Sequence, residues 1–237
     1  MRILVTNDDG LEASQLIPLI KWCRKLGEVT AFVPKFEQSG KSHSFEIRRP
    51  IEVKQVEPEP GFPIWSVDST PADCVRLAVL GFKMRFDLLI SGVNRGLNVG
   101  SDIMYSGTVA AASEAANLGI PAIALSTTPG NYDNATGELD RVLNFFREKE
   151  LMRLHNLYNV NIPANPKGIR ITHQGGPYFS DDFLPLGNDL YQPKGKPIWI
   201  DQQDFTLDTD AALNGYISVM PLTVNRTDWT VYHRLQP

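Results

Sequence analysis

The stretch Arg-Ile-Leu-Val-Thr-Asn-Asp-Asp-Gly, residues 2–10, decides the fold of this 237-residue chain. Residues 2–6 are apolar or β-branched and are followed at once by a polar, turn-forming tetrapeptide, which predicts a short buried strand. Residues 14–26 carry apolar side chains near one helical face, and Gly27 stands where a C-terminal cap would, so they predict a helix. Residues 29–33 predict a second strand. This order of strand, helix and strand predicts a parallel sheet with helices on both faces.

The alternation of strands and helices continues through the rest of the chain. Two alternating segments, 46–56 and 63–67, predict a β-hairpin excursion from the main sheet. We expect an α/β fold with a mostly parallel sheet flanked by helices, a core over residues 1–178 and a C-terminal extension over residues 179–237. The further predicted strands are 87–91, 120–125, 158–162, 168–173 and 216–219, and the further predicted helices are 108–118, 137–150 and 208–213, with a long Gly/Asn-rich loop over 92–107.

Composition limits the class of partner. The net charge of −4 provides no basic field for a nucleic-acid polymer. No apolar run approaches the roughly 20 residues of a membrane span, and the first residues match neither a signal nor a transit peptide. The two cysteines, Cys23 and Cys74, lie in helix-like segments, and the four histidines are scattered. We therefore expect a cytoplasmic protein with reduced thiols, no structural zinc and no membrane partner.

Small, oxygen-bearing side chains follow several predicted strands, where ligands bind in open α/β sheets. Asp8 and Asp9 come directly after the first strand, and two adjacent carboxylates repel each other unless a positive charge lies beside them. A hard cation such as Mg²⁺ or Mn²⁺ suits them, with neutral oxygens from Ser39 and Asn94 and with water. The alternative for Asn-Asp-Asp-Gly is a turn with a helix cap, which from the tetrapeptide alone has about equal weight.

A second candidate site is the predicted helix start at Ser106, Gly107 and Thr108. Free N–H groups at a helix N-terminus bind anions, and Gly107 would let a phosphate approach the backbone. An ordinary helix cap explains the same residues. His43, four residues after Ser39, is either a phosphate contact, a proton shuttle or an exposed loop residue.

Six stretches, in this order along the chain, resemble the SurE family. The resemblance covers roughly residues 1–222, and its strength lies in the number of motifs in register. The stretches are Val-Thr-Asn-Asp-Asp-Gly at 5–10, Gln-Ser-Gly at 38–40, Thr-Pro-Ala-Asp-Cys-Val at 70–75, Ser-Gly-Val-Asn-Arg-Gly-Leu-Asn-Val-Gly at 91–100, Tyr-Ser-Gly-Thr-Val-Ala-Ala-Ala-Ser-Glu-Ala at 105–115 and Gly-Tyr-Ile-Ser-Val at 215–219.

The resemblance implies a Rossmann-like core, a divalent-metal-dependent phosphatase acting on 5′- and 3′-nucleotides, and a homodimer or homotetramer held partly by exchanged C-terminal segments. Carried over position by position, one Mg²⁺ or Mn²⁺ ion per subunit would be held by the four residues already named, and Asn98 would join the helix start in binding phosphate. Asp8, Asn7 and Asn98 are the candidate catalytic residues.

This chain departs from the family pattern at several positions. The family usually has Gly where this chain has Gln15 and Ser69, and Thr where it has Met220. An Asp-x-Thr followed by a His is common after residue 222, but here Asn225 replaces the Asp and His233 lies outside the usual spacing. A catalytic role for the tail and its exchange between subunits are therefore open, whereas the metal motifs are intact.

The hypothesis from sequence is metal-assisted hydrolysis of nucleoside monophosphates. The nearest enzymatic alternative is a zinc deacetylase with an Asp-Asp pair after its first strand. That enzyme needs histidine ligands, but Thr6 and not a histidine precedes Asn7 here, and no later histidine has a suitable spacing. The alternative from another class is a non-catalytic nucleotide- or anion-binding module on the same fold.

Overall fold

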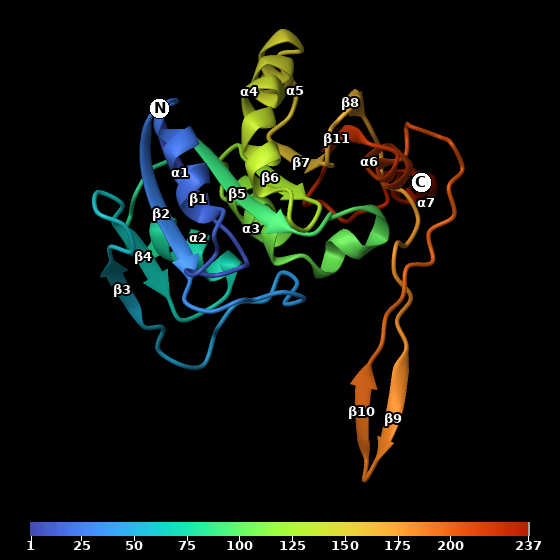
Figure 1. Cartoon of the computed structure of the whole chain (residues 1–237), viewed down its shortest axis with the longest axis horizontal. Helices are drawn as coiled ribbons and strands as arrows, with labels where there is room; N and C mark the ends of the chain where they lie inside the picture. The colour runs from blue at the N-terminus through green and yellow to red at the C-terminus, as the bar shows by residue number, and fades with distance from the viewer. Residues whose placement is uncertain (237) are drawn as a thin grey trace.

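A nine-stranded, mostly parallel sheet forms the centre of the computed structural model, which describes residues 1–236 (Figure 1). The strand order is β3-β4-β2-β1-β5-β6-β7-β11-β8. Only the β3–β4 and β7–β11 neighbours of this sheet run antiparallel. The strands are β1 (Arg2–Thr6), β2 (Glu28–Pro34), β3 (Val53–Val56), β4 (Ile64–Val67), β5 (Leu88–Arg95), β6 (Ala122–Thr127), β7 (Leu157–Ile162), β8 (Gly168–Ile171) and β11 (Tyr216–Pro221).

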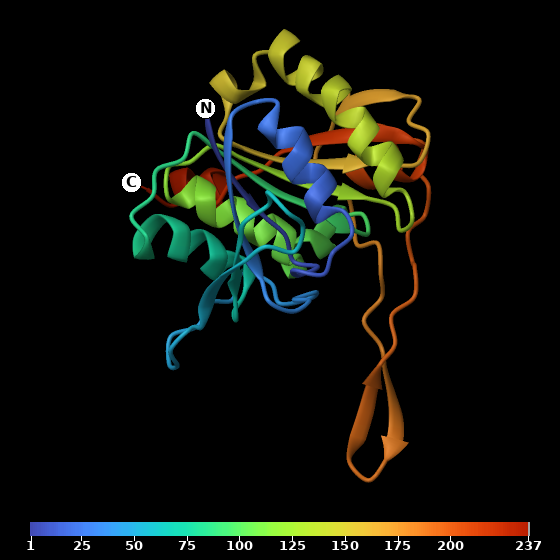
Figure 2. The ribbon, with the colours of Figure 1, turned by 60° about the vertical axis from the view of Figure 1, so that its left-hand side comes forward.

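Helices cover both faces of the sheet, so the molecule has three layers (Figure 2). The helices α1 (Leu16–Arg24) and α4 (Tyr132–Glu148) share one apolar cluster with the sheet, and α2 (Pro71–Arg76) and α3 (Gly107–Asn117) share the other. The helices α1 and α4 each bury one apolar face, whereas α2 and α3 are buried over most of their residues, and such burial is the main source of helix stability in a folded domain. Short helices complete the chain: α5 (Leu151–Leu154), α6 (Asp208–Leu213) and α7 (Trp229–Leu235).

The predicted α/β fold is confirmed by this architecture, including the antiparallel β3–β4 pair. That pair extends the main sheet, because β4 runs parallel to β2 at its edge. The boundary predicted at residue 178 remains a prediction. After it, β11 returns into the main sheet between β7 and β8.

The order of the strands reverses beside β1. The chain passes from β1 to β2 on one side, while β5 lies against β1 on the other, with Thr6 opposite Ser91. Ligand sites in open α/β sheets lie beyond the carboxyl ends of the strands at such a switch point. The residues that follow β1 and end β5 are therefore at the position where this fold binds ligands.

The predicted loop at 92–107 needs a correction, because β5 continues to Arg95 and a 3₁₀ helix covers Gly100–Tyr105. After a register shift, Asn94 and Arg95 pair with β6. Gly92 permits this path: its φ is +138°, and an added Cβ would lie 2.3 Å from the carbonyl oxygen of Leu125. At Gly92, a glycine that indicated a loop thus reflects close packing of the strand against β6.

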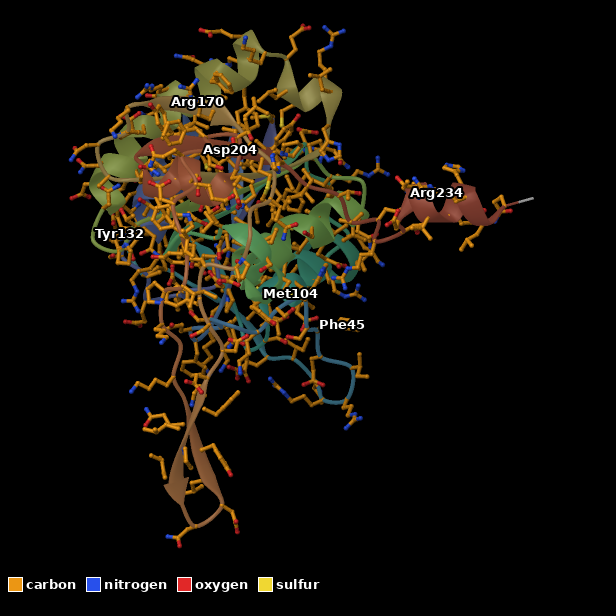
Figure 3. All side chains as sticks on the ribbon, turned by 90° about the vertical axis from the view of Figure 1, so that its right-hand side faces the viewer. Phe45, Met104, Tyr132, Arg170, Asp204 and Arg234 are labelled. Atoms are coloured by element: carbon orange, nitrogen blue, oxygen red, sulfur yellow. The ribbon has the colours of Figure 1, made fainter. Side chains whose placement is uncertain are left out.

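Two segments near the C-terminus stand away from the body of the molecule. The strands β9 (Phe183–Gly187) and β10 (Leu190–Pro193) form an antiparallel hairpin, called the arm here, that projects from the three layers in every view (Figures 1 and 2). The helix α7, which carries the labelled Arg234, also projects in Figure 3 and buries none of its residues. Among the helices that the structure describes, none has the length and apolar character that crossing a bilayer requires.

Candidate active site

Asp8 lies at the end of β1 against the first turn of α3. Its side chain is 3% exposed, and its Oδ1 accepts a hydrogen bond from the Thr108 hydroxyl. Burial raises the pKa of the Asp8 carboxyl, while the hydrogen bonds from Thr108 lower it. The helix start and the buried carboxylate are thus in direct contact, as expected if the two predicted features belong to one site.

Gly107 makes this contact possible. A Cβ added to Gly107 would lie 2.8 Å from the Cβ of Asp8 and 3.1 Å from its Oδ2, closer than side-chain carbons come. Ser106 caps the helix by accepting a hydrogen bond from the Val109 N–H at 3.1 Å. Neither this cap nor Asp8 uses the N–H of Gly107, so that donor remains for an anion.

Asp9, the neighbour of Asp8, is half-buried and bonded to two other elements. Its Oδ2 accepts hydrogen bonds from Nε2 of Gln15 at 2.5 Å and from the N–H of Arg95 at 3.2 Å. Burial and the nearby charge of Asp8 raise the pKa of Asp9 to about 6. The two carboxylates therefore destabilise each other's charge, and nearby positive charge would relieve this.

Asn7 holds the turn that presents the two carboxylates. Its side chain is fully buried and makes both amide hydrogen bonds with Gly10, donating to its oxygen at 3.0 Å and accepting from its N–H at 3.2 Å. The structure thereby gives Asn7 a positioning function, and its predicted role in catalysis stays a prediction.

The loop after β2 reaches the same edge of the sheet. The N–H of Gln38 donates to the backbone oxygen of Asp8 at 2.7 Å, which places the predicted ligand Ser39 beside the pair. The hydroxyl of Ser39 is exposed and donates to Oε1 of Glu37 at 2.8 Å. Glu37 contributes to the raised pKa of both Asp8 and Asp9, so it lies near them. Sequence reasoning passed over Glu37.

Asn94, the fourth predicted metal ligand, lies at the end of β5. The next residue, Arg95, bonds Asp9 through its backbone, which places Asn94 beside the carboxylates. The amide of Asn94 donates to the oxygen of Gly96 at 2.8 Å and keeps its own oxygen as an acceptor. Asp8, Asp9, Ser39 and Asn94 thus come from three neighbouring strand ends to one edge of the sheet.

Asn98 is held by a polar set that the sequence analysis missed. The backbone N–H of Asn98 donates to Oδ1 of Asn161 at 2.8 Å. Its backbone oxygen accepts from Nδ2 of both Asn159 and Asn161 at 2.8 Å. Its own Nδ2 donates to Ser126 at 2.8 Å. Asn159 and Asn161 are fully buried two residues apart on β7. Two asparagines on one face of an otherwise apolar strand were the signal available in the sequence.

His43 is paired away from the two aspartates. Its Nε2 lies 2.9 Å from Oε2 of Glu114, whose other oxygen accepts from Arg76 at 2.9 Å. His43 and Ser106 both line a cavity of about 480 Å³ between α3 and the segments near residues 172–174 and 220–226. The predicted phosphate contact of His43 stays a prediction.

Tyr132 is a further residue near the site that sequence reasoning missed. Labelled in Figure 3, it opens α4, and its hydroxyl is buried with no hydrogen-bond partner within residues 1–236. The negative charge of Asp9 contributes to a raised pKa of this phenol, behind the larger effect of burial. An unpartnered buried hydroxyl beside a charged pair is a donor available to a ligand.

The donor set at this edge fits a hard divalent cation. Two mutually repelling carboxylates stand beside a serine hydroxyl and an asparagine oxygen, all oxygen donors. Nowhere in residues 1–236 do three or more His, Cys, Asp and Glu side chains gather as a metal cluster. Mg²⁺ characteristically takes one or two carboxylates and leaves positions for water and phosphate.

The fold and this edge define a Rossmann-like α/β protein in which oxygen-bearing side chains and a helix start meet at the switch point of the sheet. The chain belongs to the SurE family, because the family model described as Survival protein SurE matches residues 3–181. The resemblance found in the sequence motifs is thereby confirmed.

Named relatives and a solved structure agree with this assignment. The 5′-nucleotidase SurE of Thermosipho melanesiensis is 37% identical, covering 100% of this chain and 96% of the relative. The 5′-nucleotidase SurE of Legionella pneumophila is 34% identical, covering 99% and 96%. The crystal structure of the Sure protein from Aquifex aeolicus is 30% identical, with a TM-score of 0.79 over 99% of this chain and 98% of that one.

Proposed function

We propose that this chain is a phosphoric monoester hydrolase, a 5′-nucleotidase that also accepts 3′-nucleotides and depends on one divalent cation, Mg²⁺ or Mn²⁺, per subunit. The observation that supports it most is the contact of Asp8 with the first turn of α3. That contact joins a carboxylate pair suited to a cation with a helix start suited to a phosphate. The relatives named 5′-nucleotidase SurE supply the substrate class.

Four residues would hold the cation: Asp8, Asp9, Ser39 and Asn94. The chemistry that a bound divalent cation supplies is polarisation of the phosphoryl group and compensation of negative charge. Asp8 and Asp9 supply the charge that selects a cation, and the two neutral side chains add oxygen donors.

The chain's own groups bind and orient the phosphate. The N–H of Gly107 and the hydroxyl of Ser106 lie at the positive end of the α3 dipole, where they stabilise charge that develops on the phosphoryl oxygens. Asn98, whose backbone is held by Asn161 of β7, would add its side-chain amide as a further donor. Asp8 is the group placed to orient an attacking water, because it lies at the helix start itself.

Phosphate release from a panel of 5′- and 3′-nucleoside monophosphates tests the proposal. We expect release by the wild type with Mn²⁺ or Mg²⁺, loss with EDTA, and loss by a thousandfold or more, roughly 4 kcal/mol of transition-state stabilisation, in Asp8→Asn. Absence of release with any metal from folded protein would identify a non-catalytic nucleotide- or anion-binding module instead.

We also propose that the arm and α7 form contacts in a homodimer or homotetramer. The arm exposes a row of large apolar side chains, including Phe183 at 60%, Leu186 at 57%, Leu190 at 62% and Tyr191 at 65%. An isolated two-stranded hairpin is at best marginally stable in water, and such apolar patches mark contact surfaces. The free thiols Cys23 and Cys74, both buried, are consistent with the cytoplasmic location that we propose.

A further inference from the structure

Gln15 is a buried amide beside the carboxylate pair that the proposed function does not use. It directly precedes α1, and its side chain is 3% exposed. Its side chain does not cap the helix. A buried amide without a partner is costly, so the partner that Gln15 finds is informative.

That partner is Asp9. Nε2 of Gln15 lies 2.5 Å from Oδ2 of Asp9. Oε1 of Gln15 accepts only a long hydrogen bond, from the hydroxyl of Ser14 at 3.4 Å. A carboxylate only accepts hydrogen bonds, so the amide nitrogen is the group that faces it. Hydrogen bonds to an ionised acceptor are among the stronger ones in proteins.

The bond from Gln15 divides the two oxygens of Asp9 between two tasks. Oδ2 accepts from both Gln15 and the N–H of Arg95, which come from different elements and fix the plane of the carboxylate. Oδ1 of Asp9 has no hydrogen-bond partner in the part of the chain that the structure describes. One oxygen thus orients the group and the other is left for a cation.

We propose that Gln15 is a positioning residue for the cation site, which holds Asp9 so that its Oδ1 serves as a single-oxygen ligand. This inference rests on the proposed function, because it assumes that a divalent cation binds at the carboxylate pair. Partners that orient a ligating carboxylate typically contribute about tenfold to a hundredfold to metal affinity.

The test measures Mn²⁺ binding to the full chain by titration calorimetry, without nucleotide. Gln15→Met keeps the length and volume of the side chain and removes its donor. We expect Mn²⁺ affinity to fall by about tenfold to a hundredfold, with Mn²⁺ raising the unfolding temperature less than in the wild type. Gln15→Asn, whose amide is one methylene shorter, should show the same loss and serves if the methionine variant does not fold.

Gln174→Met is the matched control. Gln174 is an exposed glutamine whose side-chain amide donates to the backbone oxygen of Gly100 at 3.1 Å, and no hydrogen bond joins it to Asp8 or Asp9. The Gln174→Met variant should bind Mn²⁺ with the affinity of the wild type. Wild-type affinity in both folded Gln15 variants would overturn the role of Gln15 and leave the cation site standing. No Mn²⁺ binding by the wild type would overturn the cation itself and the role of Gln15 with it.

Discussion

The carboxyl edge of the sheet and the arm make opposite use of their side chains. At the edge, polar groups are buried and bonded to one another: Asp8 to Thr108, Asp9 to Gln15, and Asn98 to Asn161. In the arm, apolar groups are exposed: every residue of β9 and β10 is accessible. Both arrangements are costly in a lone chain, because buried polar groups need partners and exposed apolar groups lose the benefit of burial.

The difference indicates what each region binds: the edge a small ligand, and the arm another protein surface. The edge satisfies many of its polar groups within one chain and leaves others, such as the hydroxyl of Tyr132, for a small ligand. The arm is anchored at its base, where Asp102 accepts hydrogen bonds from the N–H groups of Tyr178 at 3.0 Å and Phe179 at 2.8 Å. Its far end has no apolar surface of its own chain to cover it. We therefore expect substitutions at the edge to change catalysis and substitutions in the arm to change association.

Among the substitutions that test this difference between the edge and the arm, Gly107→Ala is expected to have the largest effect. The added methyl meets the Cβ of Asp8, which is attached directly to the backbone, so Asp8 or the helix start must move. We expect phosphate release to fall by about a hundredfold to a thousandfold, as when an oxyanion donor is lost, with the oligomeric state unchanged. Steady-state kinetics and sedimentation velocity measure the two quantities.

Gly137→Ala is the control for this exchange. Gly137 lies within α4, and an added Cβ has no heavy atom within 4 Å. Alanine there should stabilise the helix by up to about 1 kcal/mol and leave the kinetics unchanged. Normal turnover by Gly107→Ala would show that the approach of the helix start to Asp8 has no catalytic importance.

A smaller loss is expected when the support of Asn98 is removed. Asn161→Leu deletes two hydrogen bonds to the backbone of Asn98, and Asn159→Leu deletes one. We expect kcat/KM to fall by about tenfold to a hundredfold in Asn161→Leu and by less in Asn159→Leu. The measurement is kcat and KM for one nucleotide at matched fractions of folded protein.

Ser218→Ala separates this effect from simple destabilisation. Ser218 is fully buried on the neighbouring strand β11, opposite Asn161, and its hydroxyl bonds Thr172 at 2.8 Å and not Asn98. The Ser218→Ala variant should be less stable than the wild type, while its kcat and KM stay at wild-type values. If Asn161→Leu behaves like Ser218→Ala, the asparagines of β7 contribute to stability alone.

Much of the fold was predictable because its signals are local. The strand at 2–6 and the helix at 208–213 have the predicted bounds, and the other predicted core elements are present with shifted ends. The arm was missed, because its strands expose both faces and so lack the alternation of a half-buried strand. The helix α7 lacks a buried face as well.

The candidate site was predictable to the extent that strand ends converge. Asp8, Asp9, Ser39 and Asn94 were predicted to lie together because parallel strands end at one edge of the sheet. Gln15 and Tyr132 could not be found in the same way, because their placement depends on where the first turns of α1 and α4 lie against that edge. Long-range packing of this kind has no periodic signal in the sequence.

A substitution in the arm should leave catalysis and weaken association. Leu186→Lys places a charge among the exposed apolar side chains of β9, and burying a leucine contributes about 1.5–3 kcal/mol. We expect the dissociation constant of the oligomer to rise by about tenfold or more, measured by sedimentation velocity over a range of concentrations.

Leu154→Lys is the control, since Leu154 is 75% exposed on α5, outside the arm. Association should be unchanged in this variant. A monomeric wild type, or an unchanged dissociation constant in Leu186→Lys, would contradict the assignment of the arm to subunit contacts.

The smallest expected effect concerns Glu114 on α3, a buried charge that is paired within the chain. Its hydrogen bonds with His43 and then Arg76 hold the pKa of this carboxyl below its usual 4.5. Below pH 4.5 the unfolded chain therefore takes up this proton before the folded protein does, so stability falls as the solution becomes more acid. The contribution of Glu114 is complete above pH 4.5 and disappears as pH falls through its folded-state pKa.

Glu114→Gln should therefore be less stable than the wild type at neutral pH, by about 1 kcal/mol, and the difference should shrink as pH falls below 4.5. Urea unfolding across this range measures both quantities. Glu148→Gln, which removes an exposed carboxylate on α4, should follow the wild-type curve throughout. A gap between wild type and Glu114→Gln that stayed constant with pH would mean that the cluster stabilises through packing. A gap that closes would identify its charge as the stabilising element, as the pairing with His43 and Arg76 requires.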